Sequence, residues 1–301
     1  MERQTAADFD QELLILFDAY VHGDIDRRGF LDRAAKFAVG GVTAAMLLEA
    51  LNPKFAEAQQ VAKGDPRLVT EFVPYPSPQG YETTRGYLVR PAGATGRLPG
   101  IVVVHENRGL NPHIEDIARR LALENYLVLA PDALAPLGGY PGEEDKARAL
   151  FGTLDQAKTR EDMAAAFAFV KGRADCTGRV GAVGFCYGGG IAHRLATRLP
   201  DLAAAVPFYG NNPDPADAAT IKAPLLVHLA EMDTRINAAW PAYEAALKAA
   251  GVRYTVHVYP GAQHGFNNDT TPRYDEASAK LAWQRTLDFF AEHLRAGAAR
   301  R

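Results

Sequence analysis

The sequence predicts an α/β fold: a mostly parallel sheet with helices on both faces, preceded by a helical leader segment. Three observations support this prediction. Beyond about residue 98, short apolar runs alternate with helical patterns, which is how parallel sheets are built. Two longer strand patterns before residue 91 suggest an antiparallel hairpin at one edge. One apolar run, 180–185, leads through a glycine-rich turn directly into a helical pattern. The predicted domains are the leader, 1–60, and a single α/β domain, 64–301.

The elements of the larger domain follow in chain order. Segments 68–75 and 81–90 are expected to pair around the turn Ser77-Pro78-Gln79-Gly80. The later expected strands are 101–105, 126–130, 180–185, 203–208, 225–229 and 254–259. The expected helices are 112–124, 155–172, 191–199, 236–250 and 275–294. Asn111 and Pro112 make a good opening for the first of these helices.

Cys186 stands where a nucleophile is expected. It lies in the run Val183-Gly184-Phe185-Cys186-Tyr187-Gly188, between a predicted strand and a predicted helix. A strand, a Gly-x-nucleophile-x-Gly turn and a helix form the nucleophile elbow of the α/β-hydrolase fold. The first amides of the helix would favour a thiolate. Alone, this motif would leave open that Cys186 is a small buried hydrophobe, as most free cysteines are.

The order of later residues favours a catalytic role for Cys186. In this fold the acid and then the histidine follow the nucleophile along the chain. Asp233 follows the predicted strand 225–229, and His264 follows the strand 254–259. Both lie past carboxyl ends of strands, where open parallel sheets bind their ligands. We therefore predict a Cys186, Asp233, His264 triad that carries an acyl group on sulfur. The oxyanion would bind the backbone N–H groups of Tyr187 and Asn107.

Several motifs make the chain resemble the dienelactone hydrolase family. These motifs are His105-Glu106-Asn107-Arg108-Gly109-Leu110-Asn111, Ala130-Pro131-Asp132, Gly184-Phe185-Cys186-Tyr187-Gly188-Gly189, Phe208-Tyr209-Gly210 and His264-Gly265-Phe266. The resemblance runs from about residue 68 to the C-terminus. It implies that Glu106 lies beside the nucleophile and helps to form the thiolate. The alternative is a structural Glu106 that pairs with Arg108 or caps the helix near Asn111.

The resemblance fails where the family holds the substrate carboxylate. Family members that act on dienelactones use two arginines, and this chain has no arginine at 133–136 or at 267–269. Arg108 or Arg273 could replace them geometrically. Candidate pocket residues are Arg108, Tyr140, Tyr209 and Phe266. Tyr140 belongs to a glycine-rich stretch, 138–142, which is either a rim loop of the pocket or a surface connection.

Composition narrows the class of protein. A net charge of −3 gives no basic footprint for nucleic acid. Two cysteines make no disulfide framework. They flank one predicted strand, and an extended run of the ten residues that separate them spans about 30 Å, so they are not expected to pair. No motif for a metal or a dinucleotide is present, so no cofactor and no metal are expected. His193, His228 and His257 are expected to be packed in the core.

The first sixty residues resemble a twin-arginine leader. An amphipathic stretch, 8–20, precedes Arg27-Arg28, a weakly apolar run 37–48 and a small-x-small site at Ala56-Glu57-Ala58. The apolar run is too short to span a bilayer, so no stable membrane insertion is expected. Asp26 and Asp32 fit a leader poorly. We expect export to the periplasm; the alternative is a cytoplasmic protein whose helical hairpin stays attached and packs on the domain or on a second subunit.

The sequence favours a hydrolase of carboxylic esters or lactones that needs no cofactor and has a small-molecule substrate. The alternatives are a thiol redox or electrophile-sensing protein that uses Cys186, and a binding protein on the same fold. Oligomeric state stays open.

Overall fold

The computed structural model describes residues 4–295, and its centre is one sheet of eight strands. Their order across the sheet is β1-β2-β4-β3-β5-β6-β7-β8. The strands are β1 (Leu68–Ser77), β2 (Glu82–Pro91), β3 (Leu98–Val104), β4 (Leu127–Pro131), β5 (Cys176–Phe185), β6 (Ala204–Phe208), β7 (Leu225–Ala230) and β8 (Tyr254–Tyr259). β1 and β2 form the predicted antiparallel hairpin, and the pairs from β4 to β8 are parallel.

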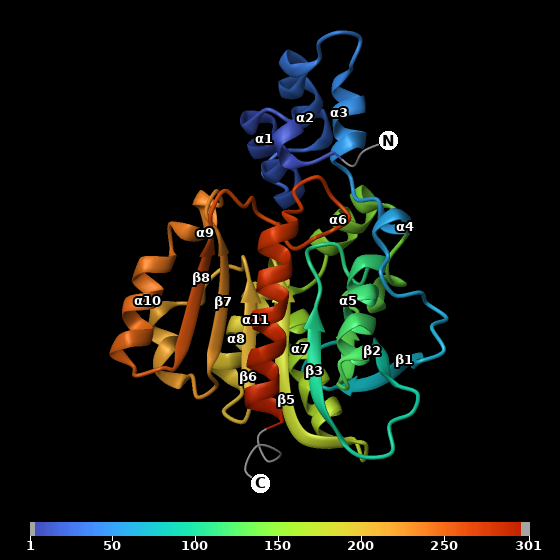
Figure 1. Ribbon diagram of the computed structural model, residues 1–301, viewed down its shortest axis with the longest axis vertical. Coiled ribbons are helices and arrows are strands. Elements are labelled where there is room, and N and C mark those ends of the chain that lie inside the picture. The colour runs from blue at the N-terminus through green and yellow to red at the C-terminus, as the bar shows by residue number, and fades with distance from the viewer. Residues whose placement is uncertain (1–3, 296–301) are drawn as a thin grey trace.

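Helices cover both faces of the sheet, as Figure 1 shows. In the α/β part these are α5 (Pro112–Leu123), α6 (Glu144–Gly152), α7 (Gln156–Gly172), α8 (Tyr187–Arg198), α9 (Thr234–Asn237), α10 (Trp240–Ala249) and α11 (Glu276–Leu294). Side chains of α5 and α11 pack in one core cluster, and those of α7, α8 and α10 pack in the other.

The central strands are apolar throughout because both of their faces are covered. In β3, Val102 and Val104 point into the core beneath α7 and α8, whereas Ile101 and Val103 point into the core beneath α5 and α11. All four side chains are fully buried.

Two helices differ from the prediction. The expected helix 236–250 is divided into α9 and α10. Pro241 lies in the first turn of α10, where a missing N–H costs nothing, so it favours a new helix start. The helix α6 was not predicted, because only Ala147 and Phe151 of its nine residues are buried and its apolar pattern is weak.

Residues 5–58 form a small helical unit, here called the cap. It contains α1 (Gln11–His22), α2 (Arg27–Ala34), α3 (Ala44–Leu51) and α4 (Phe55–Ala58). The side chains of Asp10, Asp26 and Thr43 accept hydrogen bonds from the first-turn amides of α1, α2 and α3, which satisfies N–H groups that a helix leaves open. The first three helices share a core of their own, which includes Phe17, Tyr20, Phe30 and Leu51.

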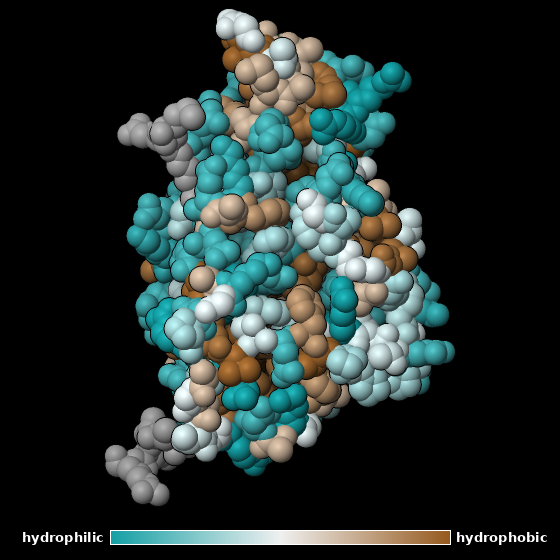
Figure 2. Space-filling model, turned by 90° about the vertical axis from the view of Figure 1, so that its right-hand side faces the viewer, coloured by the Kyte–Doolittle hydropathy of each residue, from teal (hydrophilic) through white to brown (hydrophobic). Residues whose placement is uncertain are grey.

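The cap lies over the carboxyl ends of the parallel strands, at the top of Figure 1. In the full chain, the N-terminal helices pack on the α/β domain through contacts such as Asn107 with Val21 and Arg273 with Asp18. The face drawn in Figure 2 mixes hydrophilic and hydrophobic side chains. Between residues 4 and 295, no helix combines the length and apolar character needed to cross a membrane.

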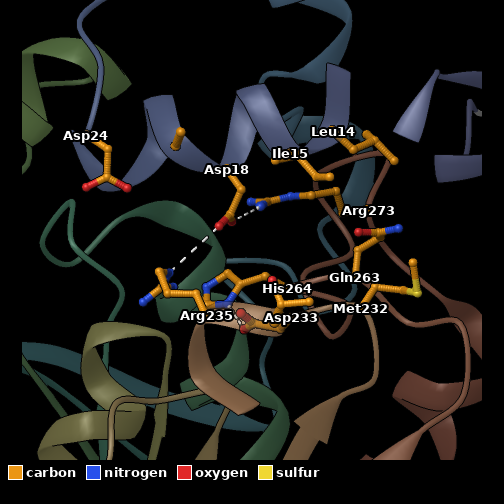
Figure 3. A pocket seen from close by; sticks show the side chains of 12 residues that line it. Leu14, Ile15, Asp18, Asp24, Met232, Asp233, Arg235, Gln263, His264 and Arg273 are labelled. Atoms are coloured by element: carbon orange, nitrogen blue, oxygen red, sulfur yellow. Dashed lines mark hydrogen bonds and ion pairs between the residues drawn. The ribbon is translucent and has the colours of Figure 1, made fainter. Parts of the chain in front are cut away.

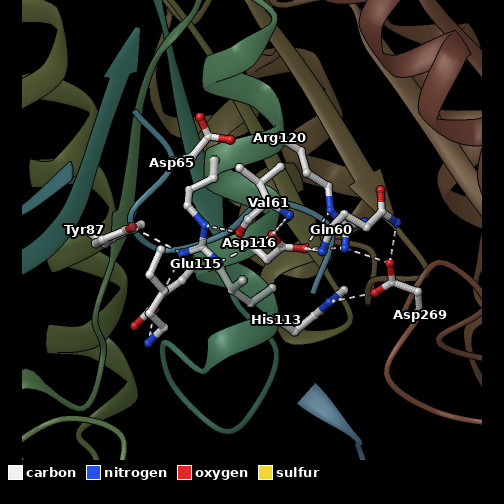
Figure 4. A network of polar contacts seen from close by, with 12 residues as sticks. Gln60, Val61, Asp65, Tyr87, His113, Glu115, Asp116, Arg120 and Asp269 are labelled. Carbon is white, nitrogen blue, oxygen red and sulfur yellow. Dashed lines mark hydrogen bonds and ion pairs between the residues drawn. The ribbon is translucent and has the colours of Figure 1, made fainter. Parts of the chain in front are cut away.

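A buried polar network fixes the segment that joins the cap to the sheet (Figure 4). The carboxylate of Asp116 on α5 accepts hydrogen bonds from the backbone N–H groups of Gln60 and Val61, at 3.1 and 2.9 Å. Arg119 donates to the carbonyl of Val61 at 2.9 Å. The Gln60 side chain donates to Asp269 at 2.7 Å. The joint between cap and domain is thus anchored to α5 and to the loop before α11.

Candidate active site

Cys186 occupies a sharp turn between β5 and α8. Its backbone is in the left-handed region, with φ 56° and ψ −112°, a conformation that costs a non-glycine residue free energy and is concentrated at functional sites. The turn needs glycine beside it, because a Cβ on Gly184 would lie 1.9 Å from the carbonyl oxygen of Gly188. The elbow predicted from the sequence is therefore formed.

Asp233 and His264 meet beside this turn. Asp233 ends the loop after β7, and its Oδ2 lies 2.5 Å from Nδ1 of His264, which follows β8. Burial raises the pKa of the Asp233 carboxyl, but the hydrogen bond and the charge of His264 lower it more, and the net shift is downward. An ionised Asp233 holds His264 in the tautomer that leaves Nε2 free.

The sulfur of Cys186 lies close to His264 without being bonded to it. One ring nitrogen of His264, the Cys186 Sγ and one ring nitrogen of His22 lie within 4.8 Å of one another. Nε2 of His264 is buried and has no hydrogen-bond partner among residues 4–295. The three residues predicted from the sequence are thus brought together, with the imidazole one small movement away from the thiol.

His22 of the cap, which the sequence analysis did not single out, makes the direct contact with the nucleophile. Its Nε2 lies 3.3 Å from the Cys186 Sγ, and its Nδ1 lies 2.8 Å from the carbonyl oxygen of Asp18 and 3.3 Å from the Asp18 carboxylate. The rings of His22 and His264 meet edge to face at 4.7 Å. The only local signal for such a pair is the spacing of Asp18 and His22, which places both on one face of α1.

Burial and neighbouring charges shift the pKa values of His22 and Asp18 in opposite directions. Burial lowers the pKa of His22, but its contacts with the Cys186 sulfur and with Asp18 raise it more, to about 9. The pKa of Asp18 is held far below its usual range: burial raises it, and His264, His22 and Arg273 together lower it by more. The guanidinium of Arg235 also approaches Nε2 of His22, at 3.0 Å. A guanidinium and an imidazolium cannot both donate along this contact, so Arg235 competes with the sulfur for His22. We favour the imidazolium, because the Asp18 carboxylate lies in contact with the ring at 3.3 Å.

Glu106 adopts neither of the structural roles considered for it. Asn268 donates to its carboxylate at 3.2 Å. Arg108 pairs instead with Glu144, at 2.7 Å, and Asn111 caps α5 with its own side chain. Glu106 borders the same small cavity as the Cys186 sulfur.

The loop that carries Asn107 is fixed by His105. The backbone N–H of Ala133 donates to Nε2 of His105 at 3.2 Å, so the proton is on Nδ1, which donates to the carbonyl of Glu106 at 2.6 Å. Burial lowers the pKa of His105, in keeping with a neutral ring. The Asn107 side chain donates to the carbonyl of Val21 in the cap at 2.9 Å.

The remaining predicted residues lie at three places around the site. Tyr187 is the first residue of α8, so its N–H has no acceptor within the helix. Tyr209 and Phe266 are buried under the site, with the Tyr209 ring 5.0 Å from that of His264. Tyr140 lies at the rim, where its hydroxyl donates to Glu144 at 2.8 Å and its ring faces Phe55 at 6.3 Å.

The cap leaves little space above the sulfur. Phe17 and Val21 of α1 close a cavity of about 20 Å³ that is also bordered by Cys186, Glu106 and Arg108. A cavity of this size holds about one water molecule. A wider cavity of about 180 Å³ lies between α1 and the loops of Asp233 and His264. Figure 3 shows Asp18 there, between the guanidinium groups of Arg235 and Arg273 and above His264.

Polar contacts hold the cap in this position. Asp18 pairs with Arg273 at 3.0 Å. Asp145 of α6 accepts from the hydroxyl of Tyr20 and pairs with Arg27 at 3.0 Å. Gln11 and Gln263 exchange side-chain hydrogen bonds. Each unit keeps its own apolar core, so the interface is the kind that allows relative motion.

Comparisons with known proteins show which family the chain belongs to. The sequence pattern of the dienelactone hydrolase family matches residues 84–294, and a second pattern, described as YqhI-like, matches residues 1–36. A protein of Escherichia coli K12 named "Putative hydrolase fragment YghX" is 55% identical over 109 residues, which cover 36% of this chain and 93% of that protein. A Salmonella typhi protein named "Putative carboxymethylenebutenolidase" is 37% identical over 221 residues, covering 69% of this chain and 82% of the relative.

A solved structure gives the same result. The crystal structure described as a "Putative Dienelactone Hydrolase" from Klebsiella pneumoniae is 32% identical, with a TM-score of 0.66 over 74% of this chain and 99% of its own. That likeness confirms the α/β-hydrolase fold predicted from the sequence.

Proposed function

The chain belongs to the dienelactone hydrolase family and is a hydrolase, and we propose that it cleaves carboxylic esters or lactones through Cys186, His264 and Asp233. The observation that carries this proposal is the convergence of the three side chains. Asp233 lies 2.5 Å from His264, and a ring nitrogen of His264 lies within 4.8 Å of the sulfur. Apart from one small closing movement, this is the arrangement that acyl transfer to a nucleophile requires.

The proposed cycle has two stages. In the first, Nε2 of His264 takes the thiol proton, and the sulfur forms a bond to the acyl carbon. The oxyanion accepts hydrogen bonds from the backbone N–H groups of Tyr187 and Asn107. The C–O bond then breaks, and His264 gives its proton to the leaving alkoxide. In the second stage, water loses a proton to His264 and attacks the thioester, which releases the acid and restores the thiol.

Glu106 is proposed to assist at the start of this cycle. Its carboxylate borders the cavity beside the sulfur and is held by an amide, Asn268, rather than by a cation. A carboxylate in that position can accept the thiol proton when substrate enters the cavity and pass it on to Nε2 of His264, so that the same proton later reaches the leaving alkoxide.

The cap has to move before a substrate reaches the sulfur. A cavity of about 20 Å³ has no room for an ester or lactone. In the closed position, Arg108 is neutralised by Glu144 and Arg273 by Asp18. Opening of the cap would remove Asp18 from Arg273, which would then be free to bind a carboxylate on the substrate.

The redox alternative has less support. The only other cysteine of the chain is Cys176, at the opposite end of β5. The ten residues of that strand span about 30 Å, so Cys176 could not resolve an oxidised Cys186 within one chain.

The decisive experiment measures hydrolysis of p-nitrophenyl esters and small lactones by the wild type, Cys186→Ala and His264→Ala. We expect either substitution to lower kcat by about a thousandfold or more, and mass spectrometry to detect an acyl group on Cys186 in the wild type. His257→Ala, on the outer strand β8, is the control and should retain activity. Wild-type turnover no faster than that of either active-site variant would refute the proposal.

A further inference from the structure

The cap and the predicted triad together supply three metal-binding atoms. The donors are an imidazole nitrogen of His22, the sulfur of Cys186 and an imidazole nitrogen of His264, all within 4.8 Å of one another. We infer that these three side chains form a binding site for a soft divalent transition metal, best matched by Zn²⁺, which exists only when the cap is closed. The inference uses the residues of the proposed function but goes beyond it, because it does not require hydrolysis.

The donor set suits zinc. Zn–N bonds of about 2.0 Å and Zn–S bonds of about 2.3 Å place neighbouring tetrahedral donors roughly 3.3–3.6 Å apart. Nε2 of His22 and Sγ of Cys186 are already 3.3 Å apart. The widest pair, at no more than 4.8 Å, needs to close by roughly 1 Å, which one side-chain rotation can supply. Thiolate and imidazole ligands select zinc over magnesium or calcium.

Both imidazoles are oriented as metal ligands usually are. The other ring nitrogen of a zinc-bound histidine is commonly bonded to a carboxylate or a carbonyl oxygen, which fixes its tautomer and direction. His264 has Asp233 in that place, at 2.5 Å. His22 has the carboxylate of Asp18 at 3.3 Å and the Asp18 carbonyl at 2.8 Å. The sulfur is therefore flanked by two carboxylate-supported imidazoles.

An independent observation points to a missing ligand. His264 is only 5% exposed. Its Nε2 is therefore shielded from solvent, and it has no hydrogen-bond partner among the described residues. Burial of a polar atom without a partner costs free energy, and a bound metal would remove that cost. The adjoining cavity of about 20 Å³ has room for one water molecule, which would complete a tetrahedral set.

Arg235 opposes metal binding in the closed form. Its guanidinium lies 3.0 Å from Nε2 of His22 and would have to turn away when a cation enters. The Arg235 side chain is 37% exposed, so it can turn into solvent. Metal binding replaces the thiol proton of Cys186, and it would both block the nucleophile and cross-link the cap to the α/β domain.

The test is a Co²⁺ titration of the metal-free full-length chain in mildly alkaline buffer, where protons compete less for His22. We expect one equivalent to bind and to produce a thiolate-to-cobalt absorption band. His22→Ala should weaken binding at least tenfold and reduce the band, and Asp18→Asn should weaken it about 10- to 100-fold. Arg235→Gln should strengthen binding. His257→Ala is the matched control and should bind like the wild type.

A second readout separates loss of the site from loss of folding. Circular dichroism should be the same for every variant, and Zn²⁺ should protect Cys186 from iodoacetamide in the wild type but not in His22→Ala. Equal Co²⁺ affinity in wild type and His22→Ala would overturn the inference, as would absence of the band in the wild type. Ester hydrolysis in the presence of a chelator, without Co²⁺ binding, defeats only the metal site. Co²⁺ binding without any hydrolysis defeats only the proposed function.

Discussion

At the scale of single residues, the sulfur of Cys186 faces two imidazoles that have very different origins. His264 belongs to the loop after β8, whereas His22 comes from the cap and lies within hydrogen-bonding distance of the sulfur, at 3.3 Å. Each imidazole is supported by an aspartate. The residue that touches the nucleophile in the closed form is therefore not a member of the proposed triad.

Glu106 gives the first prediction at this scale. Glu106→Gln removes a proton acceptor beside the sulfur but keeps the shape and the amide contact with Asn268. We expect alkylation of Cys186 by iodoacetamide to slow several-fold, because less thiolate forms when the cavity is entered. The exposed Glu124, at the end of α5, gives the control Glu124→Gln. Equal alkylation rates in the wild type and Glu106→Gln would return Glu106 to a structural role.

The sequence located Cys186, Asp233 and His264 because each follows a strand at a position that the fold prescribes. It could not locate His22. The contact joins residues 164 positions apart, and nothing near His22 marks it as more than the end of an amphipathic helix. Likewise, the sequence could not show that Arg108 pairs with Glu144 rather than with Glu106, because that contact depends on where α6 lies.

At the scale of elements, α1 covers the Cys186 sulfur and is attached to the α/β domain by polar contacts. Most of its apolar side chains pack into the core of the cap. The side facing the α/β domain presents Asp18, His22 and the hydroxyl of Tyr20, with Phe17 and Val21 over the cavity beside Cys186. Interactions of this kind are individually weak and are screened by salt. Single substitutions at these contacts should therefore shift the balance between the closed and the open position of the cap.

Asp145 is the most informative of these substitutions. Asp145→Asn weakens contacts with both Tyr20 and Arg27, each worth about 0.2–1 kcal/mol. We expect the cap to open more often, and kcat/KM for ester hydrolysis to rise roughly threefold to tenfold. Asp201→Asn removes an exposed ion pair with Lys171, away from the cap, and should leave kcat/KM unchanged. A fall in kcat/KM for Asp145→Asn would mean that the closed cap assists the reaction.

The polar network that joins the cap to the domain should make the stability of the fold depend on pH. Burial raises the pKa of Asp269, but His113 and Arg120 lower it more, to about 2. Because the folded pKa is below the unfolded value of about 3.8, the charged form stabilises the fold above pH 4, and this stabilisation is lost as the pH falls toward 2. Its size at neutral pH is about 2 kcal/mol.

Urea unfolding should reveal this contribution. Asp269→Asn should lower the free energy of unfolding by about 2 kcal/mol at pH 6, and the difference from the wild type should shrink as the pH approaches 3. Asp288→Asn, on α11, is the control. A difference that stays constant with pH would show that Asp269 acts through packing rather than through its charge.

Some helix boundaries could be predicted from the sequence, and others could not. Asn111 and Pro112 identified the start of α5 because capping is local. Pro241 offered the same kind of signal for α10, but the apolar residues before it continued the pattern and concealed the break. The helix α6 has few buried residues, and its position depends on contacts with the cap.

At the scale of the whole molecule, the architecture of the α/β domain could be predicted from the sequence, whereas the position of the cap could not. A mostly parallel sheet with helices on both faces follows from the alternation of strand and helix patterns, whereas the order of the strands is known only from the structure. The place of the cap depends on a few polar contacts between distant segments, such as Asp18 with Arg273 and Asn107 with Val21. No periodicity encodes such contacts.

The same segment that forms the cap has the features of an export leader, and we propose that the chain is exported by the twin-arginine route and cleaved after Ala58. Arg27 and Arg28 lie at the start of α2, and Ala56 and Glu57 of α4 are exposed. Gln60 and Val61, just beyond, are anchored to α5 by Asp116, so the new terminus would stay docked. Cleavage would remove Asp18 and His22 together and leave the Cys186 site open.

This proposal predicts two forms of the protein. In a bacterium with a twin-arginine transporter, we expect the periplasmic fraction to contain a chain that begins near Gln59, and the cytoplasmic fraction to contain the full chain. Arg27→Lys with Arg28→Lys should abolish the periplasmic form, whereas Arg33→Lys, on the same helix, should not. The periplasmic form should hydrolyse esters faster than the full chain and should have lost the Co²⁺ band, because its nucleophile is uncovered and His22 is absent. A periplasmic chain that still begins at Met1 would refute cleavage, and a protein confined to the cytoplasm would refute export.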